Sequence, residues 1–121
     1  MSLGKIAVIN MRLRDHEPCV DPHASVLNDV AFLDSVLSCI AEICGLTVLN
    51  TSHHAFMPYG VTICKILSES HISIHTWPEL RSCAIDVYSC RDDLDEVAIE
   101  AYLRAHFDVE HLTSQVHVRR I

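Results

Sequence analysis

The segment Glu69-Ser70-His71-Ile72-Ser73-Ile74-His75-Thr76-Trp77-Pro78-Glu79 decides how this chain is organised. In an extended strand, successive side chains point to opposite faces. One face of this segment would carry Ile72, Ile74 and Thr76, and the other would carry His71, Ser73, His75, Trp77 and Glu79. The first face suits a hydrophobic core. The second face is typical of the exposed side of an antiparallel sheet, or of a functional site.

Further runs with strand-like composition lie on both sides of this segment. They are Leu3–Leu13, Leu46–Asn50, Gly60–Leu67, Cys83–Ser89 and Gln115–Arg120. The last run alternates polar and apolar residues, which is typical of an edge strand. Asp15–His23 contains Pro18 and Pro22 and is expected to be a loop. Thr51–Tyr59 either continues the preceding strand or forms a loop.

Two helices are expected from the spacing of apolar residues. Ser25 is a plausible N-cap for the first helix, which would end at Gly45. Its apolar positions are Val26, Val30, Leu33, Leu37, Ile40, Ala41 and Cys44. Asp92 or Asp93 could cap the second helix. Its expected apolar stripe is Leu94, Val97, Ala98, Ala101, Tyr102 and Ala105.

The order of these elements predicts an α+β fold in which an antiparallel sheet carries both helices on one face, as a two-layer sandwich. The chain has 121 residues and half of them are apolar, which fits a single domain over residues 1–121. A domain of this size leaves apolar surface that an oligomer could bury.

The net charge of −7 argues against nucleic acid or an anionic membrane as the main partner, and a small cationic ligand fits its sign better. The first ten residues lack the features of a signal peptide, and no apolar run approaches the roughly 18 residues of a membrane span. We therefore expect a cytoplasmic protein. Without secretion signals, the six cysteines are expected to be reduced core thiols, and no Cys–His spacing indicates a metal site.

Residues 69–79 resemble the processing segment of the prokaryotic S-adenosylmethionine decarboxylase proenzymes, a family of pyruvoyl-dependent decarboxylases, and a looser similarity extends over Asn50–Cys90. The resemblance implies that the chain cuts itself between Glu69 and Ser70. The products would be residues 1–69 (beta chain) and 70–121 (alpha chain), with Ser70 converted to a pyruvoyl group. Such a ketone forms a Schiff base with a substrate amine and accepts the electrons left by loss of CO₂.

The resemblance also assigns roles in processing and turnover. Thr62 and His75 would act in self-cleavage, where a hydroxyl polarises the intermediate and an imidazole moves a proton. Cys90 would return a proton to the substrate carbon after decarboxylation. Read from the residues alone, His75 could equally be a sheet histidine with a satisfied side chain, and Cys90 a small buried thiol.

Three further residues correspond to the family's substrate site. Phe56 and Trp77 would line it with aromatic rings that can stack on adenine. Glu79 would accept hydrogen bonds from the ribose hydroxyls. The alternative for both aromatic residues is a place in the core.

Strand geometry gives an independent expectation. Ser70 and His75 are five residues apart, so a straight strand places them about 16 Å apart on opposite faces. Either the strand breaks sharply at Ser70, or the histidine that processes one Ser70 comes from a second chain. The second case predicts a homodimer of cleaved protomers with composite active sites.

The sequence departs from the family pattern at three places. Thr62-Ile63 replaces a serine and glycine, Leu80-Arg81-Ser82-Cys83 replaces an aromatic-glycine-aromatic-alanine run, and Ile6 replaces a histidine. The first expectation remains decarboxylation of S-adenosyl-L-methionine, which gives the aminopropyl donor for spermidine. Decarboxylation of arginine or ornithine with the same cofactor, and a non-enzymatic partner subunit that is never cleaved, stay open.

Overall fold

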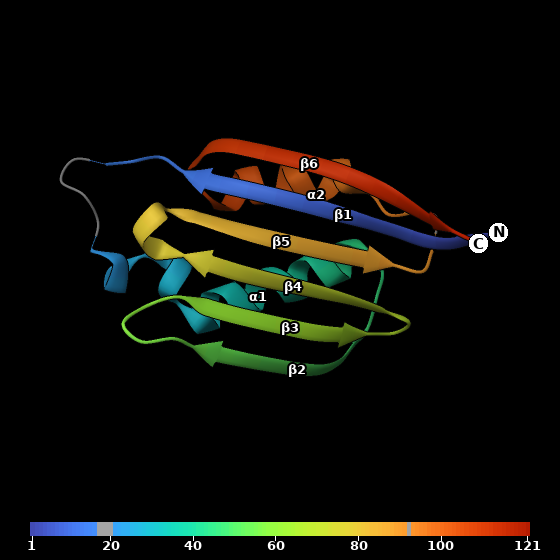
Figure 1. Ribbon diagram of the computed structural model, residues 1–121, viewed down its shortest axis with the longest axis horizontal. Helices are drawn as coiled ribbons and strands as arrows, with labels where there is room; N and C mark the ends of the chain where they lie inside the picture. The colour runs from blue at the N-terminus through green and yellow to red at the C-terminus, as the bar shows by residue number, and fades with distance from the viewer. Residues whose placement is uncertain (17–20, 92) are drawn as a thin grey trace.

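A six-stranded antiparallel sheet forms the base of the molecule (Figure 1). The computed structural model describes residues 1–16, 21–91 and 93–121. The sheet order is β2-β3-β4-β5-β1-β6, so β4 has two strands on one side and three on the other. The strands are β1 (Ser2–Leu13), β2 (Val48–Ala55), β3 (Val61–Leu67), β4 (Ser70–Trp77), β5 (Ser82–Ser89) and β6 (Val109–Arg120).

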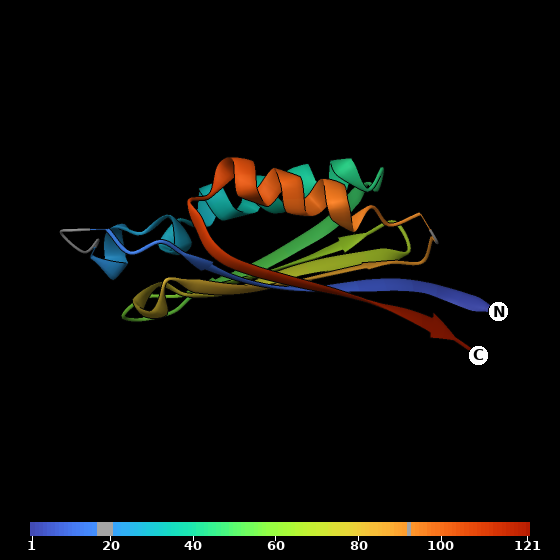
Figure 2. The ribbon, with the colours of Figure 1, turned by 90° about the horizontal axis from the view of Figure 1, so that it is seen from above.

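Both α-helices cover the same face of this sheet (Figure 2). Helix α1 spans Val30–Ile43 and helix α2 spans Glu96–His106. The opposite face of the sheet carries no helix among the described residues, and we refer to it as the open face. The predicted two-layer α+β sandwich is therefore confirmed.

The core lies between the sheet and the helices, and one row of isoleucines crosses it. Ile63, Ile74, Ile85 and Ile9 are direct partners on four neighbouring strands, and each is fully buried. Leu33, Leu37 and Ile40 of α1 belong to the same cluster. Each such side chain contributes roughly 1.5–3 kcal/mol by leaving water. This row fixes the register of β4, because a slip by one residue would turn its histidines into the core.

The first helix begins later than the sequence suggested. Ser25 does cap a helix, but a short 3-10 turn, η2 (Val26–Asn28), which follows another, η1 (Pro22–Ala24). The N-cap of α1 is Asp29, whose side chain accepts a hydrogen bond from the Phe32 N–H at 3.0 Å. Val26, which was expected on the apolar face of the helix, is 45% exposed, and Leu27 is buried instead. The expected loop over Asp15–His23 is partly outside the described residues, including Pro18 and Cys19.

The second helix also differs from its expected cap and apolar stripe. Asp95 is the N-cap, Asp93 lies ahead of the helix, and Asp92 is outside the described residues. The buried helical positions are Ile99 and Leu103, whereas Val97 is exposed. Because this segment is rich in alanine, its sequence is compatible with more than one buried side of the helix. In the structure, the side of α2 that contacts β6 and α1 is the buried one.

Three strand boundaries correct the sequence reading. Strand β2 continues from Val48 to Ala55, so most of Thr51–Tyr59 is strand. Strand β6 begins at Val109 rather than Gln115, and it is an edge strand as expected. Strand β4 ends at Trp77, because Pro78 has no N–H for the ladder and begins the 3-10 turn η3 (Pro78–Leu80). Glu79 therefore does not continue the alternation of the strand.

One charged residue lies on the core face of β3. Lys65 is only 3% exposed, and its Nζ donates to Asp34 Oδ1 at 2.7 Å and to Thr51 Oγ1 at 3.1 Å. Asp34 belongs to α1 and Thr51 to β2. The ammonium group therefore ties the helix to the edge of the sheet.

We expect Asp34→Ala to destabilise the fold by about 1–3 kcal/mol, because it leaves a buried ammonium without its charged partner. In a Lys65→Met background the same change should cost much less, since no buried charge remains. Urea unfolding of both single variants and the double variant, at one protein concentration, measures the coupling. Equal costs of Asp34→Ala in the two backgrounds would show that the pair is not energetically coupled.

Candidate active site

The predicted site residues lie in two groups, one at each end of β4. The first group surrounds the turn between β3 and β4, where Leu67 pairs with Ser70. Glu69 has a positive φ of 63°, a conformation that costs a non-glycine residue about 1–2 kcal/mol. Ser70 is 8% exposed, and its Oγ accepts a hydrogen bond from the Cys90 N–H at 3.2 Å. The Cys90 Sγ donates to Glu69 Oε2 at 3.3 Å.

Contacts with the cleavage site, rather than burial, separate Cys90 from the other cysteines that the structure describes. Cys39, Cys44, Cys64, Cys83 and Cys90 are all free thiols, whereas Cys19 lies outside the described residues. Burial raises the pKa of the Cys83 thiol to about 12 and, with smaller effects of two aspartates, that of Cys44 to about 11. The expectation of core thiols is wrong for Cys64, which is exposed on β3. Of the described cysteines, Cys90 is the one bonded to Glu69 and Ser70.

The second group lies on the open face at the other end of β4. Thr62 on β3 is the direct partner of His75, and Thr62 Oγ1 lies 3.0 Å from His75 Nδ1. His75 is exposed. The two residues expected to act together in processing are therefore in hydrogen-bond contact on the surface.

A pocket of about 320 Å³ begins beside this pair. Its lining consists of Phe56, Tyr59, Gly60, Thr62, His75, Thr76, Trp77 and Glu79. Phe56 is 49% exposed and Trp77 is 43% exposed, so the alternative that they are core residues is wrong. The five residues expected at this end thus lie around one pocket, with two ring surfaces open to a ligand.

A second pocket of about 550 Å³ lies between the end of β1, η3 and the end of α2. Among the predicted site residues it contains only Glu79. Its polar rim is already paired in part, because His16 and Arg14 both contact Asp108. The smaller pocket, which holds the Thr62–His75 pair, is therefore the better candidate for substrate.

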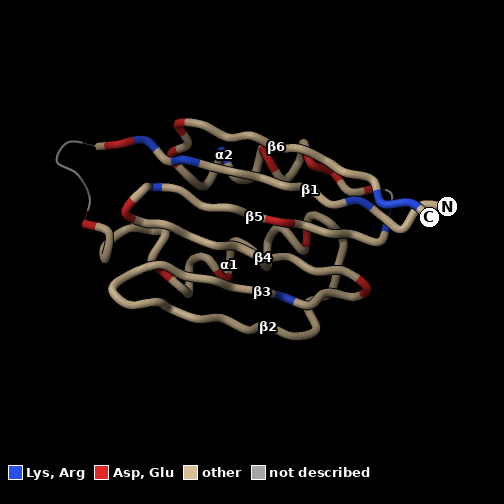
Figure 3. Tube along the Cα trace, in the orientation of Figure 1, with Lys and Arg blue, Asp and Glu red and all other residues tan. Residues whose placement is uncertain are grey.

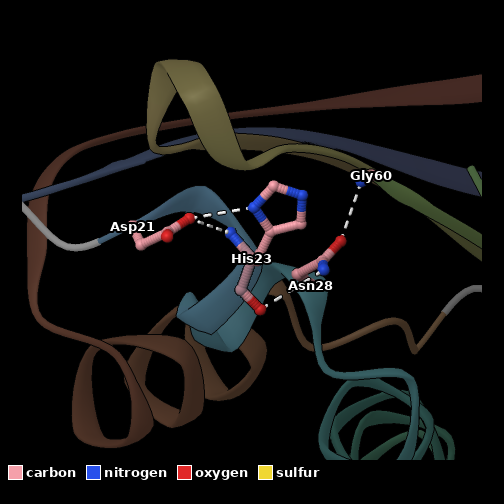
Figure 4. A network of polar contacts seen from close by, with 4 residues as sticks. All are labelled: Asp21, His23, Asn28 and Gly60. Carbon is pink, nitrogen blue, oxygen red and sulfur yellow. Dashed lines mark hydrogen bonds and ion pairs between the residues drawn. The ribbon is translucent and has the colours of Figure 1, made fainter. Parts of the chain in front are cut away.

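Hydrogen bonds from the segment before α1 hold the loop that carries this pocket (Figure 4). Asn28 Oδ1 accepts from the Gly60 N–H at 2.8 Å, and Asn28 Nδ2 donates to the His23 carbonyl at 3.4 Å. Asp21 Oδ1 accepts from the His23 backbone N–H, a bond that lowers the pKa of Asp21. The β2–β3 loop is thus fixed against a segment far from it in sequence.

Sequence reasoning missed Tyr59 and Gly60 in the pocket and Asn28 behind it. The turn sequence Met57-Pro58-Tyr59-Gly60, between two strand-like runs, could have placed Tyr59 and Gly60 next to Phe56. Asn28 gave no such signal, because its role depends on η2 packing beside β4. In that contact the Thr76 hydroxyl donates to the Leu27 carbonyl at 2.7 Å.

The two groups are separated along an unbroken strand. Every residue of β4 from Ser70 to His75 has a partner on β3 without a register shift, and β5 pairs regularly from His71 to Trp77. Ser70 shares the buried face with Ile72 and Ile74, whereas His75 lies on the open face. The alternative of a break in the strand between them is therefore wrong, and about 16 Å remains between Ser70 and His75 of one chain.

The described residues contain no group of three or more histidine, cysteine, aspartate or glutamate side chains placed to hold a metal ion. Within those residues, no helix is both long and apolar enough to cross a membrane.

Comparison with known proteins identifies the family. A family model described as S-adenosylmethionine decarboxylase matches residues 18–120. The S-adenosylmethionine decarboxylase proenzyme of Thermosipho melanesiensis is 38% identical over 99 residues, which cover 76% of this chain and 75% of that protein. The corresponding proenzyme of Thermosipho africanus is 39% identical over 99 residues, covering 81% and 72%.

A solved structure agrees with the sequence comparison. The crystal structure of the adenosylmethionine decarboxylase from Aquifex aeolicus superposes with a TM-score of 0.78 at 27% identity, over 99% of this chain and 92% of that chain. The match extends over both helices and the whole sheet. This chain therefore belongs to the S-adenosylmethionine decarboxylase family.

Proposed function

We propose that this chain is a self-processing, pyruvoyl-dependent decarboxylase that converts S-adenosyl-L-methionine to its decarboxylated form, the aminopropyl donor for spermidine synthesis. The observation that carries the proposal is the contact of Cys90 with both Glu69 and Ser70 at one end of β4. Family membership and the names of the relatives favour this function over decarboxylation of arginine or ornithine, and over an uncleaved partner subunit. The cytoplasm as its place of action stays a prediction.

Self-cleavage would begin with Ser70 Oγ attacking the carbonyl carbon of Glu69. The Glu69–Ser70 C–N bond breaks and leaves an ester with a free amino group. Elimination then breaks the Cβ–Oγ bond, releases residues 1–69 with a C-terminal carboxylate, and leaves an enamine that water converts to the ketone with loss of ammonia. Strain at Glu69 favours the first step, because cleavage frees this residue from its positive φ.

Ser70 fits as the precursor of the cofactor. Its Oγ is held by the Cys90 N–H, and little solvent reaches it. A pyruvoyl group at this position would supply the electron sink for loss of CO₂ from an α-amino acid. Cys90 holds a proton on Sγ beside the same position, directed at Glu69 Oε2, and is the residue placed to protonate the product carbon.

At the other end of β4, the pocket residues would bind the substrate. Phe56 and Trp77 offer half-exposed rings for adenine, and the Glu79 carboxylate would accept hydrogen bonds from ribose. His75, bonded to Thr62, would exchange the proton during self-cleavage. These residues cannot serve the Ser70 of their own chain, because the strand between them is straight.

A homodimer that pairs two open faces would bring the two ends together. A twofold axis near the middle of β4 would bring the His75 end of one chain next to the end of the other chain that carries Glu69 and Ser70, and would form two equivalent sites. Because Ser70 is turned toward the helices, the partner's His75 would have to reach the Glu69–Ser70 bond at the strand end rather than across the open face. The open face suits such contact, because Val8, Ile66 and Trp77 are exposed on it. Strands β2, β3 and β4 carry no charged residue except the buried Lys65 (Figure 3).

The purified protein should consist of two fragments that meet at Glu69–Ser70, and the larger fragment should be residues 1–69. Ser70→Ala has no hydroxyl for the attack and should stay whole. Intact mass spectrometry of denatured protein reads both results, and Edman chemistry should find the C-terminal fragment blocked. Wild-type protein that remains whole after long incubation would contradict the proposal.

Processed protein should release CO₂ from S-adenosyl-L-methionine and not from arginine or ornithine. Cys90→Ala should still cleave, because its backbone N–H remains to hold the Ser70 hydroxyl, but its turnover should fall by about 10²–10⁴ without the proton donor. Radiolabelled CO₂ release per cleaved chain measures both. Unchanged turnover would return Cys90 to the role of a structural thiol, and preference for a basic amino acid would change the substrate assignment.

Composite sites predict that two inactive variants rescue each other. Ser70→Ala keeps its histidine and His75→Ala keeps its serine, so a mixed dimer contains one complete processing site. Co-expression should give cleaved chains that carry only the His75→Ala substitution, and each variant expressed alone should stay uncleaved. Mixed dimers without cleavage would show that the partner's histidine does not process Ser70.

A further inference from the structure

The backbone of β1 passes unusually close to the strand end that carries Cys90. In chain order, Lys5 is the first residue of β1 that pairs with β5. Its partner is Ser89, the residue at which β5 ends. Gly4 is buried beside this point, with a φ of +108°. A Cβ at Gly4 would lie 2.1 Å from the Ser89 carbonyl oxygen and 2.6 Å from the Cys90 Cα. Position 4 therefore has no room for any side chain.

Both atoms in the way belong to the backbone, so no change of rotamer can relieve the contact. Carbon atoms in van der Waals contact are about 3.5–4.0 Å apart, so Ser89 and Cys90 would have to withdraw by on the order of 1 Å. Cys90 makes two bonds to the cleavage site, one from its N–H to Ser70 Oγ and one from its Sγ to Glu69. A shift of this size would disturb both of them.

We infer that Gly4 is a positioning residue for Cys90: its missing Cβ lets β1 support the Ser89–Cys90 backbone at the distance that brings Cys90 onto Glu69 and Ser70. The inference rests on the proposed function, because it assigns Gly4 to the same reaction. A misplacement of about 1 Å can cost roughly 10²-fold in rate. The pocket residues lie at the other end of the sheet, and in the proposed dimer they come from the partner, so a shift of Ser89 and Cys90 leaves their own positions unchanged and KM should be much less affected.

Gly45 provides a matched control. It also has a positive φ, +67°, which lies in the left-handed region where alanine costs about 1 kcal/mol, whereas the φ of +108° at Gly4 lies outside that region. The nearest atom to its Cβ would be the end of the Arg91 side chain at 3.7 Å, which is ordinary contact. Gly45→Ala therefore adds a Cβ at a glycine of positive φ without the collision with Cys90.

The experiment compares wild-type protein, Gly4→Ala and Gly45→Ala for the rate of self-cleavage and for kcat and KM with S-adenosyl-L-methionine per cleaved chain. Gly4→Ala should cleave and turn over about 10- to 100-fold more slowly, with KM within about threefold of wild type. Gly45→Ala should match wild type in all three. Circular dichroism and thermal unfolding establish that each variant is folded. Repeating the cleavage and turnover assays at a lower temperature includes a variant that is folded only there.

Equal cleavage and kcat in Gly4→Ala and Gly45→Ala would overturn the inference, as would a rise in KM with unchanged kcat. Gly4→Ala that stays unfolded at both temperatures, beside folded Gly45→Ala, would assign Gly4 to the folding of β1 and overturn it as well. Failure of the proposed function has a different signature, because wild-type protein and Gly45→Ala would then also remain whole or release no CO₂.

Discussion

The regular pairing of β4 with both of its neighbours is the constraint on which the rest of the molecule depends. Because β4 has no bulge, its side chains keep strict alternation and its length is fixed. Ser70 is thereby turned toward the helices and His75 toward the open face. A chemistry that needs both residues at one peptide bond cannot be completed within a single chain of this shape.

The two faces of the sheet carry different groups. The helix-covered face contains the row of four isoleucines and the Lys65–Asp34 pair. The open face carries the Thr62–His75 pair and exposed apolar residues such as Ile66. In a small domain, covering that face with a second copy would add apolar burial, and it would bring the partner's pocket to the strand end at which Ser70 lies.

Among the described residues, two non-glycine residues hold a positive φ: Glu69, where the chain is proposed to be cut, and Arg81, which follows η3 at the other end of the sheet. Glu69 holds a left-handed conformation at the tip of the β3–β4 turn, and Gly4 holds a positive φ where β1 meets Ser89 and Cys90. Packing of the sheet maintains both conformations. The turn is thus kept strained by the same strands that bring Cys90 to it.

The sequence by itself determined that the chain forms a sheet with two helices and that β4 is a strand with candidate site residues near both of its ends. Alternation and short motifs are local properties, so they can be read without the tertiary structure. The sequence did not determine where the helices begin. Ser25 and Asp29 are both good caps, and in the structure Ser25 caps the short turn η2 whereas Asp29 starts α1. Nor could it show that Trp77 is half exposed, that Asn28 holds Gly60, or that Gly4 lies against Cys90. Those facts are contacts between segments distant in the chain, and only the packed tertiary structure brings such segments together.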